Sequence, residues 1–280
     1  MASKPHAPPA PSAPAKKQSP RATIPEIVPL ALATGVSKTA HRIVLYGTGG
    51  IGKSTLAAYL PAPLFLDVES STEFLEVAYD SELRTAPSWS MLRGKLAAIA
   101  QAPPKGVRSI VIDTASVAEE LAKEHVIATR KTDKGRLVDS IEGFGWGKGW
   151  QFVYDEFNGL LADLDRIATL GVNVCLVAHE VSALVPYPAA EDFIRWEPLL
   201  YSGDKKGRGS TRERVKNWSD HVVFIGYDVH VEDGKGSGSG TRTIWTQELP
   251  THIAKSRVKQ TSINFSLEDP SAIWRELGIS

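Results

Sequence analysis

The stretch HRIVLYGTGGIGKSTLAAYL, residues 41–60, decides the fold of this chain. The apolar run 41–47 ends in glycine and predicts a buried strand, while the apolar spacing of 54–60 predicts a helix that ends before Pro61. Between them, GTGGIGKS satisfies the pattern GxxxxGK[ST] of a phosphate-binding loop. Glycines let the backbone N–H groups of such a loop turn toward phosphate oxygens, and the helix N-terminus adds partial positive charge.

This loop predicts a site for ATP and Mg²⁺. Lys53 is expected to reach the β- and γ-phosphates, Ser54 to place its hydroxyl on Mg²⁺, and Thr55 to contact the α-phosphate. A guanine-reading NKxD-type motif is missing from the sequence, which favours ATP over GTP. The residues predicted to bind nucleotide are Gly47, Thr48, Gly49, Gly50, Ile51, Gly52, Lys53, Ser54 and Thr55.

Two further strands end in carboxylates that suit the same site. The run SIVID ends in Asp113, which is predicted to be the second protein ligand of Mg²⁺. Thr114 follows it, so the base that activates water must come from another segment. The strand 63–69 ends in Asp67 and Glu69, whose spacing places both side chains on one face of an extended chain. Glu69 is predicted to polarise the attacking water, whereas a purely structural role for Asp67 stays open.

Buried strands alternate with helices along the rest of the chain. This order predicts an α/β fold with a mainly parallel central sheet flanked by helices. Two late strands joined by a glycine-rich tip predict an antiparallel C-terminal extension, with more β-structure and a short helix, DPSAIWREL, after them. The other predicted strands are 108–114, 172–179, 221–231 and 241–249, and the helices are 117–130 and 152–171, with helical segments in 72–101. Segments predicted to lack regular structure are 131–150 and 182–218.

Composition excludes several classes of protein. The 280 residues hold 32 Lys+Arg and 32 Asp+Glu, which excludes a protein that coats nucleic acid through bulk positive charge. A single cysteine, Cys175, excludes a disulfide framework and a multi-cysteine metal site, and it suggests a reducing, cytoplasmic setting. No run of about 18 apolar residues is present, so no membrane span or membrane partner is predicted.

The N-terminal segment differs from the rest. Residues 1–23 are rich in Pro, Ala and Lys and hold four basic residues and no acidic one. Such a composition cannot bury enough apolar surface to offset the entropy of ordering, so we predict a disordered tail. This tail is either solvated or a docking arm, and one ATPase domain is predicted over 24–280.

The order of these motifs resembles that of RecA-type ATPases such as the RecA and RadA recombinases. More narrowly, FGWGKGW (144–150), an amphipathic helix and VAHE (177–180) resemble small phage ATPases with an AAA/RecA core, some of which act in single-strand annealing and recombination. The resemblance covers residues 40–270, roughly. It implies a RecA-like core, ATP hydrolysis, single-stranded DNA as partner, a homo-oligomer with ATP between subunits, and the host cytoplasm if a phage encodes the protein.

The resemblance also assigns roles to residues outside the loop. His179 ends the strand that carries Gln in RecA, which implies that it reports the state of the γ-phosphate. Lys255 and Arg257 match the late Lys-x-Arg strand that reaches ATP across a subunit interface. Basic loops after the later strands are expected to contact DNA, helped by the nearby aromatic residues Trp196 and Tyr201. The residues predicted to bind DNA are Lys205, Lys206, Arg208, Arg212 and Arg214, and the basic loop 130–136 adds to them.

Two other functions fit the loop. A P-loop kinase of a small molecule or nucleotide would use 204–216 as a lid, although Glu69 and the Lys-x-Arg pair suit it less well. A nucleotide-gated assembly or scaffold protein would bind ATP tightly and turn it over slowly.

Overall fold

The computed structural model describes residues 29–34, 40–204, 209–232, 235–258 and 260–279. Contacts divide the chain into two units, Met1–Ser37 and Lys38–Ser280. In the first unit, residues 29–34 are exposed and form neither helix nor strand, and the tail predicted over 1–23 lies outside the described residues. Among the described residues, no helix combines the length and apolarity that crossing a membrane requires.

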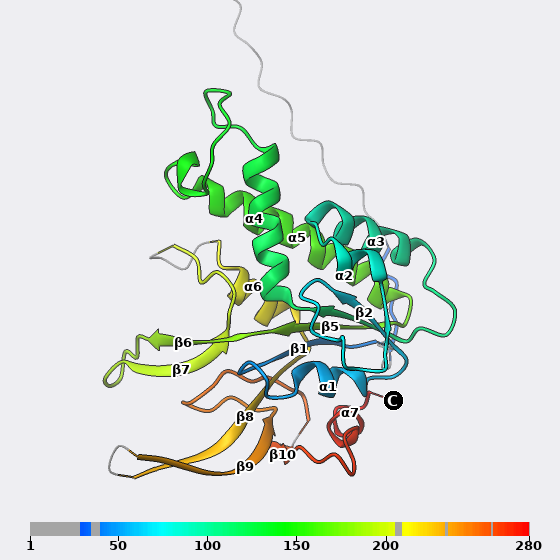
Figure 1. Ribbon diagram of the computed structural model, residues 1–280, viewed down its shortest axis with the longest axis vertical. Coiled ribbons are helices and arrows are strands. Elements are labelled where there is room, and N and C mark those ends of the chain that lie inside the picture. Colours follow the sequence, from blue (N-terminus) through cyan, green and yellow to red (C-terminus); the bar gives the residue numbers. More distant parts are fainter. Residues whose placement is uncertain (1–28, 35–39, 205–208, 233–234, 259, 280) are drawn as a thin grey trace, which may run out of the picture. The chain divides into compact units, whose positions relative to one another are not determined.

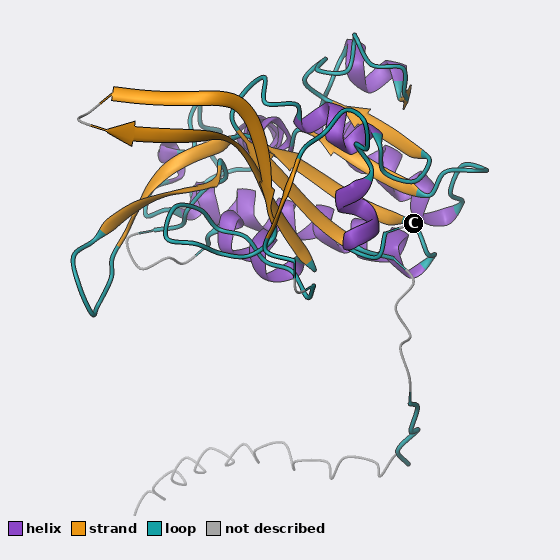
Figure 2. Ribbon diagram, turned by 90° about the horizontal axis from the view of Figure 1, so that it is seen from below, coloured by secondary structure: helices purple, strands orange, loops and turns teal. Residues whose placement is uncertain are grey.

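The second unit is built around an eight-stranded sheet in the order β10-β9-β8-β1-β5-β4-β2-β3. The six strands from β8 to β3 run parallel, while β9 and β10 are antiparallel to their neighbours. This arrangement confirms the predicted fold class, including the antiparallel extension that Figure 2 shows as a long, curved hairpin. The strands are β1 (Arg42–Gly47), β2 (Pro63–Asp67), β3 (Ala78–Tyr79), β4 (Ser109–Asp113), β5 (Asn173–Ala178), β8 (His221–Glu232), β9 (Lys235–Trp245) and β10 (Ser262–Asn264).

Helices cover both faces of the sheet (Figure 1). Successive side chains of each strand point to opposite faces, so each strand contributes to a core on each side of the sheet. Along β1, Val44 and Tyr46 enter the core beneath α3, α4, α5 and α6, while Ile43 and Leu45 enter the core beneath α1 and α7. The strands are therefore apolar on both faces, as buried parallel strands require. The helices are α1 (Lys53–Ala58), α2 (Ser81–Thr85), α3 (Trp89–Gln101), α4 (Ala115–Thr129), α5 (Lys148–Thr169), α6 (Thr211–Trp218) and α7 (Ala272–Glu276), with a 3-10 turn at Glu142–Phe144.

The prediction that 182–218 is irregular was wrong. Glu180–Val185 (β6) and Phe193–Pro198 (β7) pair as a separate antiparallel hairpin, and α6 follows. The start of α6 had a sequence signal, because Ser210 and Glu213 have the S-x-x-E spacing of a capping box. In the structure, the Ser210 hydroxyl accepts a hydrogen bond of 3.0 Å from the Glu213 N–H. The segment 131–150 likewise contains the 3-10 turn and the first residues of α5.

The predicted C-terminal helix is confirmed as α7, which packs on the helix that follows the phosphate-binding loop. Its Trp274 is 1% exposed, and the indole N–H donates a 3.0 Å hydrogen bond to the Leu56 carbonyl in α1. This contact joins the end of the chain to the nucleotide-binding region through a buried aromatic ring.

Trp274→Ala is expected to lower the free energy of unfolding by about 3–5 kcal/mol, because it removes a fully buried aromatic side chain and leaves a cavity. Trp274→Phe keeps most of the apolar contact and loses the hydrogen bond to Leu56, so its effect should be clearly smaller. Urea unfolding followed by circular dichroism measures both. Equal losses in the two variants would contradict the packing role.

Candidate functional site

The phosphate-binding loop connects β1 to α1 as predicted. Gly50 and Gly52 have φ values of 75° and 103°, which favour glycine. The Lys53 side chain is buried, and its Nζ donates hydrogen bonds of 2.9 Å to the carbonyls of Gly47 and Thr48. Burial lowers the pKa of Lys53, while the negative charges of Asp113 and Glu69 oppose this shift. The carboxylates near the Lys53 amine thus favour its charged form.

A cavity of 370 Å³ lies over this loop and collects residues from four separate segments. It is lined by loop residues, by Glu69 after β2, by Asp113 at the end of β4 and by His179 after β5. Parallel strands end at the same edge of the sheet, which is why these segments meet. Phe74 and Leu75 also line the cavity, although no motif in the sequence points to them.

The surroundings of Asp113 fit Mg²⁺. The carboxylate is fully buried, and burial raises its pKa, while the nearby hydroxyl groups of Ser54 and Ser71 act to lower it. Ser71 Oγ donates to Oδ2 over 2.7 Å, whereas Oδ1 has no hydrogen-bond partner among the described residues. A buried carboxylate oxygen without a partner is costly, and a cation relieves that cost.

The ligand set also suits this ion. No cluster of three or more His, Cys, Asp or Glu side chains arranged for a metal occurs in the described part of the chain. Mg²⁺ characteristically takes one or two protein ligands and completes its shell with substrate phosphates and water. Ser54 and Asp113 therefore fit an ion that binds together with ATP.

The structure resolves the open role of Asp67 in favour of a structural one. The expectation that Asp67 and Glu69 share one face was wrong, because β2 ends at Asp67 and the chain turns there. The buried Asp67 carboxylate accepts hydrogen bonds from the N–H groups of Glu69, Ser71 and Thr72, and from the Thr72 hydroxyl at 2.6 Å. Burial alone would raise the pKa of Asp67, but these hydrogen bonds outweigh it and lower the pKa.

Asp67 thereby holds the turn that carries Glu69 into the cavity. There, the Glu69 carboxylate has two partners. His179 Nε2 lies 2.9 and 3.1 Å from its two oxygens, and Thr114 Oγ1 donates to Oε2 over 2.8 Å. The His179 hydrogen bond is the largest influence on Glu69 and lowers its pKa, with Thr114 adding to the effect against burial.

Glu69 is therefore ionised at neutral pH and can accept a proton. Thr114, directly after Asp113, therefore belongs to the site, because its hydroxyl orients the Glu69 carboxylate. From the sequence alone, Thr114 indicates only that no glutamate follows Asp113.

His179→Ala is expected to move the acid limb of the kcat–pH profile to higher pH. Loss of the hydrogen bond that lowers the Glu69 pKa lets this pKa rise toward its ordinary value of about 4.3, so the carboxylate is protonated sooner as pH falls. His179→Gln is the matched control, since an amide can still donate to Glu69. Steady-state hydrolysis between pH 4 and 8 measures the shift, and an unchanged acid limb in His179→Ala would contradict it.

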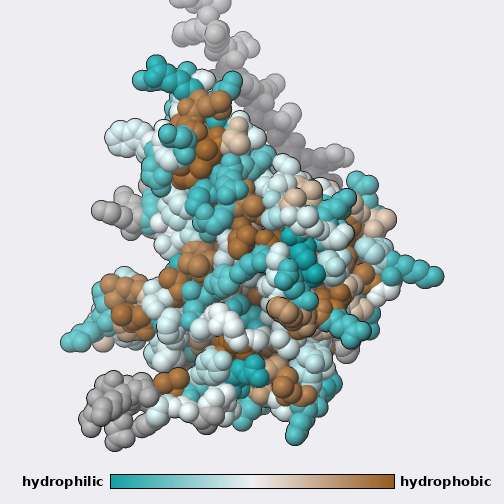
Figure 3. Space-filling view, viewed as in Figure 1, coloured by the Kyte–Doolittle hydropathy of each residue, from teal (hydrophilic) through white to brown (hydrophobic). Residues whose placement is uncertain are grey.

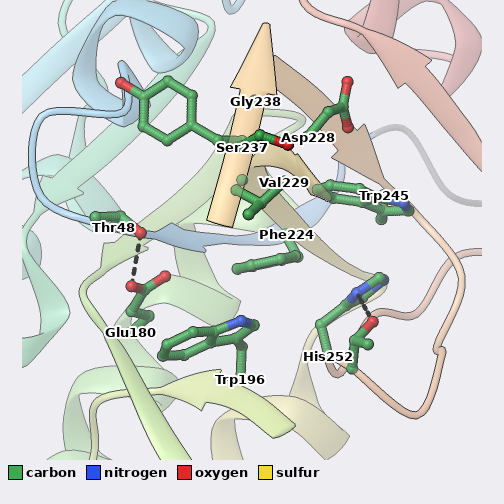
Figure 4. A pocket seen from close by; sticks show the side chains of 13 residues that line it. Thr48, Glu180, Trp196, Phe224, Asp228, Val229, Ser237, Gly238, Trp245 and His252 are labelled. Atoms are coloured by element: carbon green, nitrogen blue, oxygen red, sulfur yellow. Dashed lines mark hydrogen bonds between the residues drawn. The ribbon is translucent and has the colours of Figure 1, made fainter. Parts of the chain in front are cut away.

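A second cavity, of 1020 Å³, adjoins the phosphate-binding loop at Thr48 (Figure 4). Aromatic side chains of β7, β8 and β9 surround it, among them Trp196, Phe224 and Trp245. Burial lowers the pKa of the lining His252 to about 4, so that its imidazole is neutral. Thr48 Oγ1 donates a 2.6 Å hydrogen bond to Glu180, which also lines this cavity (Figure 4).

The segment with Lys255 and Arg257 is not a regular strand, contrary to expectation; Lys255 forms a single bridge with Val222. The Lys255 amine donates to the carbonyls of Lys216, Asn217 and Ser219, the shortest at 2.6 Å. It therefore caps the C-terminal end of α6, where a cation is favourable. Arg257 is exposed. A role of the two residues in a neighbouring subunit's site stays a prediction.

The residues predicted to bind DNA differ in where they lie and in what they contact. Lys205, Lys206 and Arg208 lie outside the described residues. Arg212 is 8% exposed and bonds Glu197 over 2.6 Å and the Leu200 carbonyl over 2.9 Å, so its position gives no support to the predicted DNA contact. Arg214 is half-buried, and its Nε donates to Asn158 over 2.8 Å. Both belong to α6 rather than to a loop.

Comparisons with known proteins found similar solved structures and one matching family. The crystal structure of the flagellar accessory protein FlaH from Methanocaldococcus jannaschii is similar at 12% identity and a TM-score of 0.40, covering 82% of this chain and 86% of that one. A KaiC-like protein of Pyrococcus horikoshii OT3 is similar at 12% identity and a TM-score of 0.40, covering 81% and 86%. The chain matches no curated protein. Residues 39–258, well over half of the chain, match the AAA domain family. With its phosphate-binding loop at the end of a parallel strand, this chain belongs to the AAA domain family.

Proposed function

We propose that this protein hydrolyses ATP with Mg²⁺ and that single-stranded DNA governs the reaction, in recombination or annealing. The observation that carries the hydrolysis is the placement of Glu69. It shares one cavity with Lys53, Ser54 and Asp113, and His179 and Thr114 hold its carboxylate by hydrogen bonds of 2.8–3.1 Å. An ionised, oriented carboxylate beside a phosphate-binding loop is suited to activating water.

In this reaction, a water oxygen bonds to the γ-phosphorus as the bond from that phosphorus to the bridging oxygen breaks, giving ADP and phosphate. The loop N–H groups and Lys53 bind the phosphate oxygens. Glu69 accepts the proton of the water, and its hydrogen bonds to His179 and Thr114 keep the accepting oxygens in place. Ser54 and Asp113 would hold Mg²⁺, which would supply positive charge to offset the charge that develops on the phosphates.

The kinase alternative loses support from the same contacts. A lid over 204–216 would bring arginines to the transferred phosphate, but Arg212 is buried against Glu197, and α6 is fixed by Lys255. Hydrolysis also needs a base for water near the phosphates, which Glu69 provides. We therefore favour ATP hydrolysis over phosphoryl transfer to a small acceptor.

Single-stranded DNA as partner rests on charge and exposure. Lys131, Lys134 and Arg136 are exposed on the loop between α4 and α5, where they suit a phosphate backbone. We also propose a homo-oligomer with ATP between subunits, for which exposed Arg257 is the candidate contact.

The test is the ATPase rate of the full chain with and without single-stranded DNA, and with candidate small acceptors. Stimulation by DNA supports the proposal, and annealing of complementary labelled strands then tests the role in recombination. Phosphorylation of an acceptor would replace the proposal by a kinase. Tight ATP binding without turnover or any response to DNA would favour a nucleotide-gated scaffold.

A further inference from the structure

Trp146 is presented to solvent in an unusual way. Its side chain is fully exposed, and it lies between two glycines on the turn before α5. The φ values of Gly145, Trp146 and Gly147 are 72°, 52° and 72°, all in the left-handed region. Glycine adopts this region readily, but a bulky side chain is a rare outlier there. Trp146 therefore makes no packing contribution, and both the exposure of its apolar ring and its backbone conformation are unfavourable for a tryptophan.

The turn beneath Trp146 is firmly built. Phe144 is buried and packs edge-on against Phe152 with 5.4 Å between ring centroids. A Cβ on Gly149 would lie 2.3 Å from the Ile141 carbonyl oxygen, so only glycine fits this packing. The Lys148 N–H also bonds the Gly145 carbonyl over 3.0 Å. Trp146 is thus the projecting tip of a packed turn.

A basic loop lies beside this tip. Lys131, Lys134 and Arg136 are exposed on a tight turn closed by hydrogen bonds of 2.8 and 2.9 Å between Thr132 and the backbone of Gly135 and Arg136. Asp133 of the same turn is paired with Lys148, which ties the basic loop to the turn of Trp146. Both segments lie together at the outer end of α4 (Figure 1), and Figure 3 shows hydrophilic side chains at the tip of this region with a hydrophobic patch directly beneath them.

We propose that Trp146 and the basic loop form a binding site for single-stranded nucleic acid, in which a base stacks on the indole and the three cations contact the phosphates. Exposed positive charge selects a polyanion. A flat, projecting indole selects a strand whose base faces are free, since a duplex hides them. The inference deepens the proposed function and rests on its DNA partner.

The experiment measures equilibrium binding of labelled oligodeoxythymidylate to the full chain in the presence of ATP. Trp146→Gly suits the backbone conformation of the tip, so it removes the indole without endangering the fold. It is expected to weaken binding by about 5- to 100-fold, the loss of one stacked base, while DNA-independent ATP hydrolysis stays unchanged. Trp146→Phe should bind nearly as wild type. Tyr187→Ala, which removes another exposed aromatic ring, is the matched control and should leave binding unchanged.

The role of the three cations is tested separately, by the salt dependence of DNA binding. Replacing Lys131, Lys134 and Arg136 by Gln should reduce the slope of log affinity against log salt by about 2, because about 0.7 counterions are released per phosphate contact on a single strand. Equal binding by wild type and Trp146→Gly, with DNA stimulation intact, would overturn the site but not the proposed function. Equal binding of duplex would overturn the single-strand preference. No binding of DNA by the wild type would overturn both.

Discussion

Lys53→Ala is expected to lower kcat for ATP hydrolysis by at least about 10³-fold, because it removes the buried cation that would meet the developing charge on the transferred phosphate. The truncation also leaves the Gly47 and Thr48 carbonyls without the amine that bonds them, so nucleotide affinity is expected to fall as well. Phosphate release from purified protein measures the turnover, and the shift of the melting temperature by ATP measures the affinity.

The matched control for this variant is Lys123→Ala, which removes a half-buried lysine that pairs with Glu120 on α4, away from the phosphate-binding loop. It should leave turnover unchanged. Circular dichroism must show that the Lys53 variant is folded. Hydrolysis at the wild-type rate in a folded Lys53→Ala protein would overturn the whole site assignment.

Glu69→Gln separates binding from chemistry. The amide keeps the size of the side chain and an oxygen that accepts from Thr114, but it cannot take a proton from water at neutral pH. We expect the single-turnover rate of hydrolysis to fall by about 10²- to 10⁴-fold, the usual contribution of a general base, while ATP binds with nearly wild-type affinity. Equilibrium dialysis and quenched-flow measurements test the two halves.

The contrasting variant is Asp67→Asn, which alters the acceptor that holds the turn from Glu69 to Thr72. It should lower the free energy of unfolding as well as activity, whereas Glu69→Gln should leave stability nearly unchanged. Loss of ATP binding in Glu69→Gln would show that Glu69 is structural rather than a base.

The parts of the site that the sequence predicts well are those set by local order. The phosphate-binding loop and Asp113 each directly adjoin an apolar run, so their place at the end of a buried strand follows from the neighbouring residues. The exact end of β2 does not follow in this way. Asp67 ends the strand because four hydrogen bonds from the next turn hold it, and the alternation of an extended chain fails beyond it.

Tertiary pairing accounts for other differences. Arg212 looked like a loop cation, but it is neutralised by Glu197 on β7, a partner that only the folded hairpin brings near. The same holds for Lys255, whose acceptors are the carbonyls at the end of α6. The sequence shows how many basic residues are present, but only the folded structure shows which of them are already paired within the protein.

The end of β5 has a consequence for how the two cavities respond to their occupants. His179 contacts Glu69 in one cavity, and the next residue, Glu180, contacts Thr48 of the phosphate-binding loop beside the aromatic one. Because Thr48 is predicted to bind nucleotide, an occupant that draws Glu180 away from Thr48 is expected to change the affinity for ATP. By thermodynamic reciprocity, ATP would then change the affinity for that occupant by the same factor. The affinity of one cavity for its ligand, measured with the other cavity empty and occupied, therefore tests this coupling.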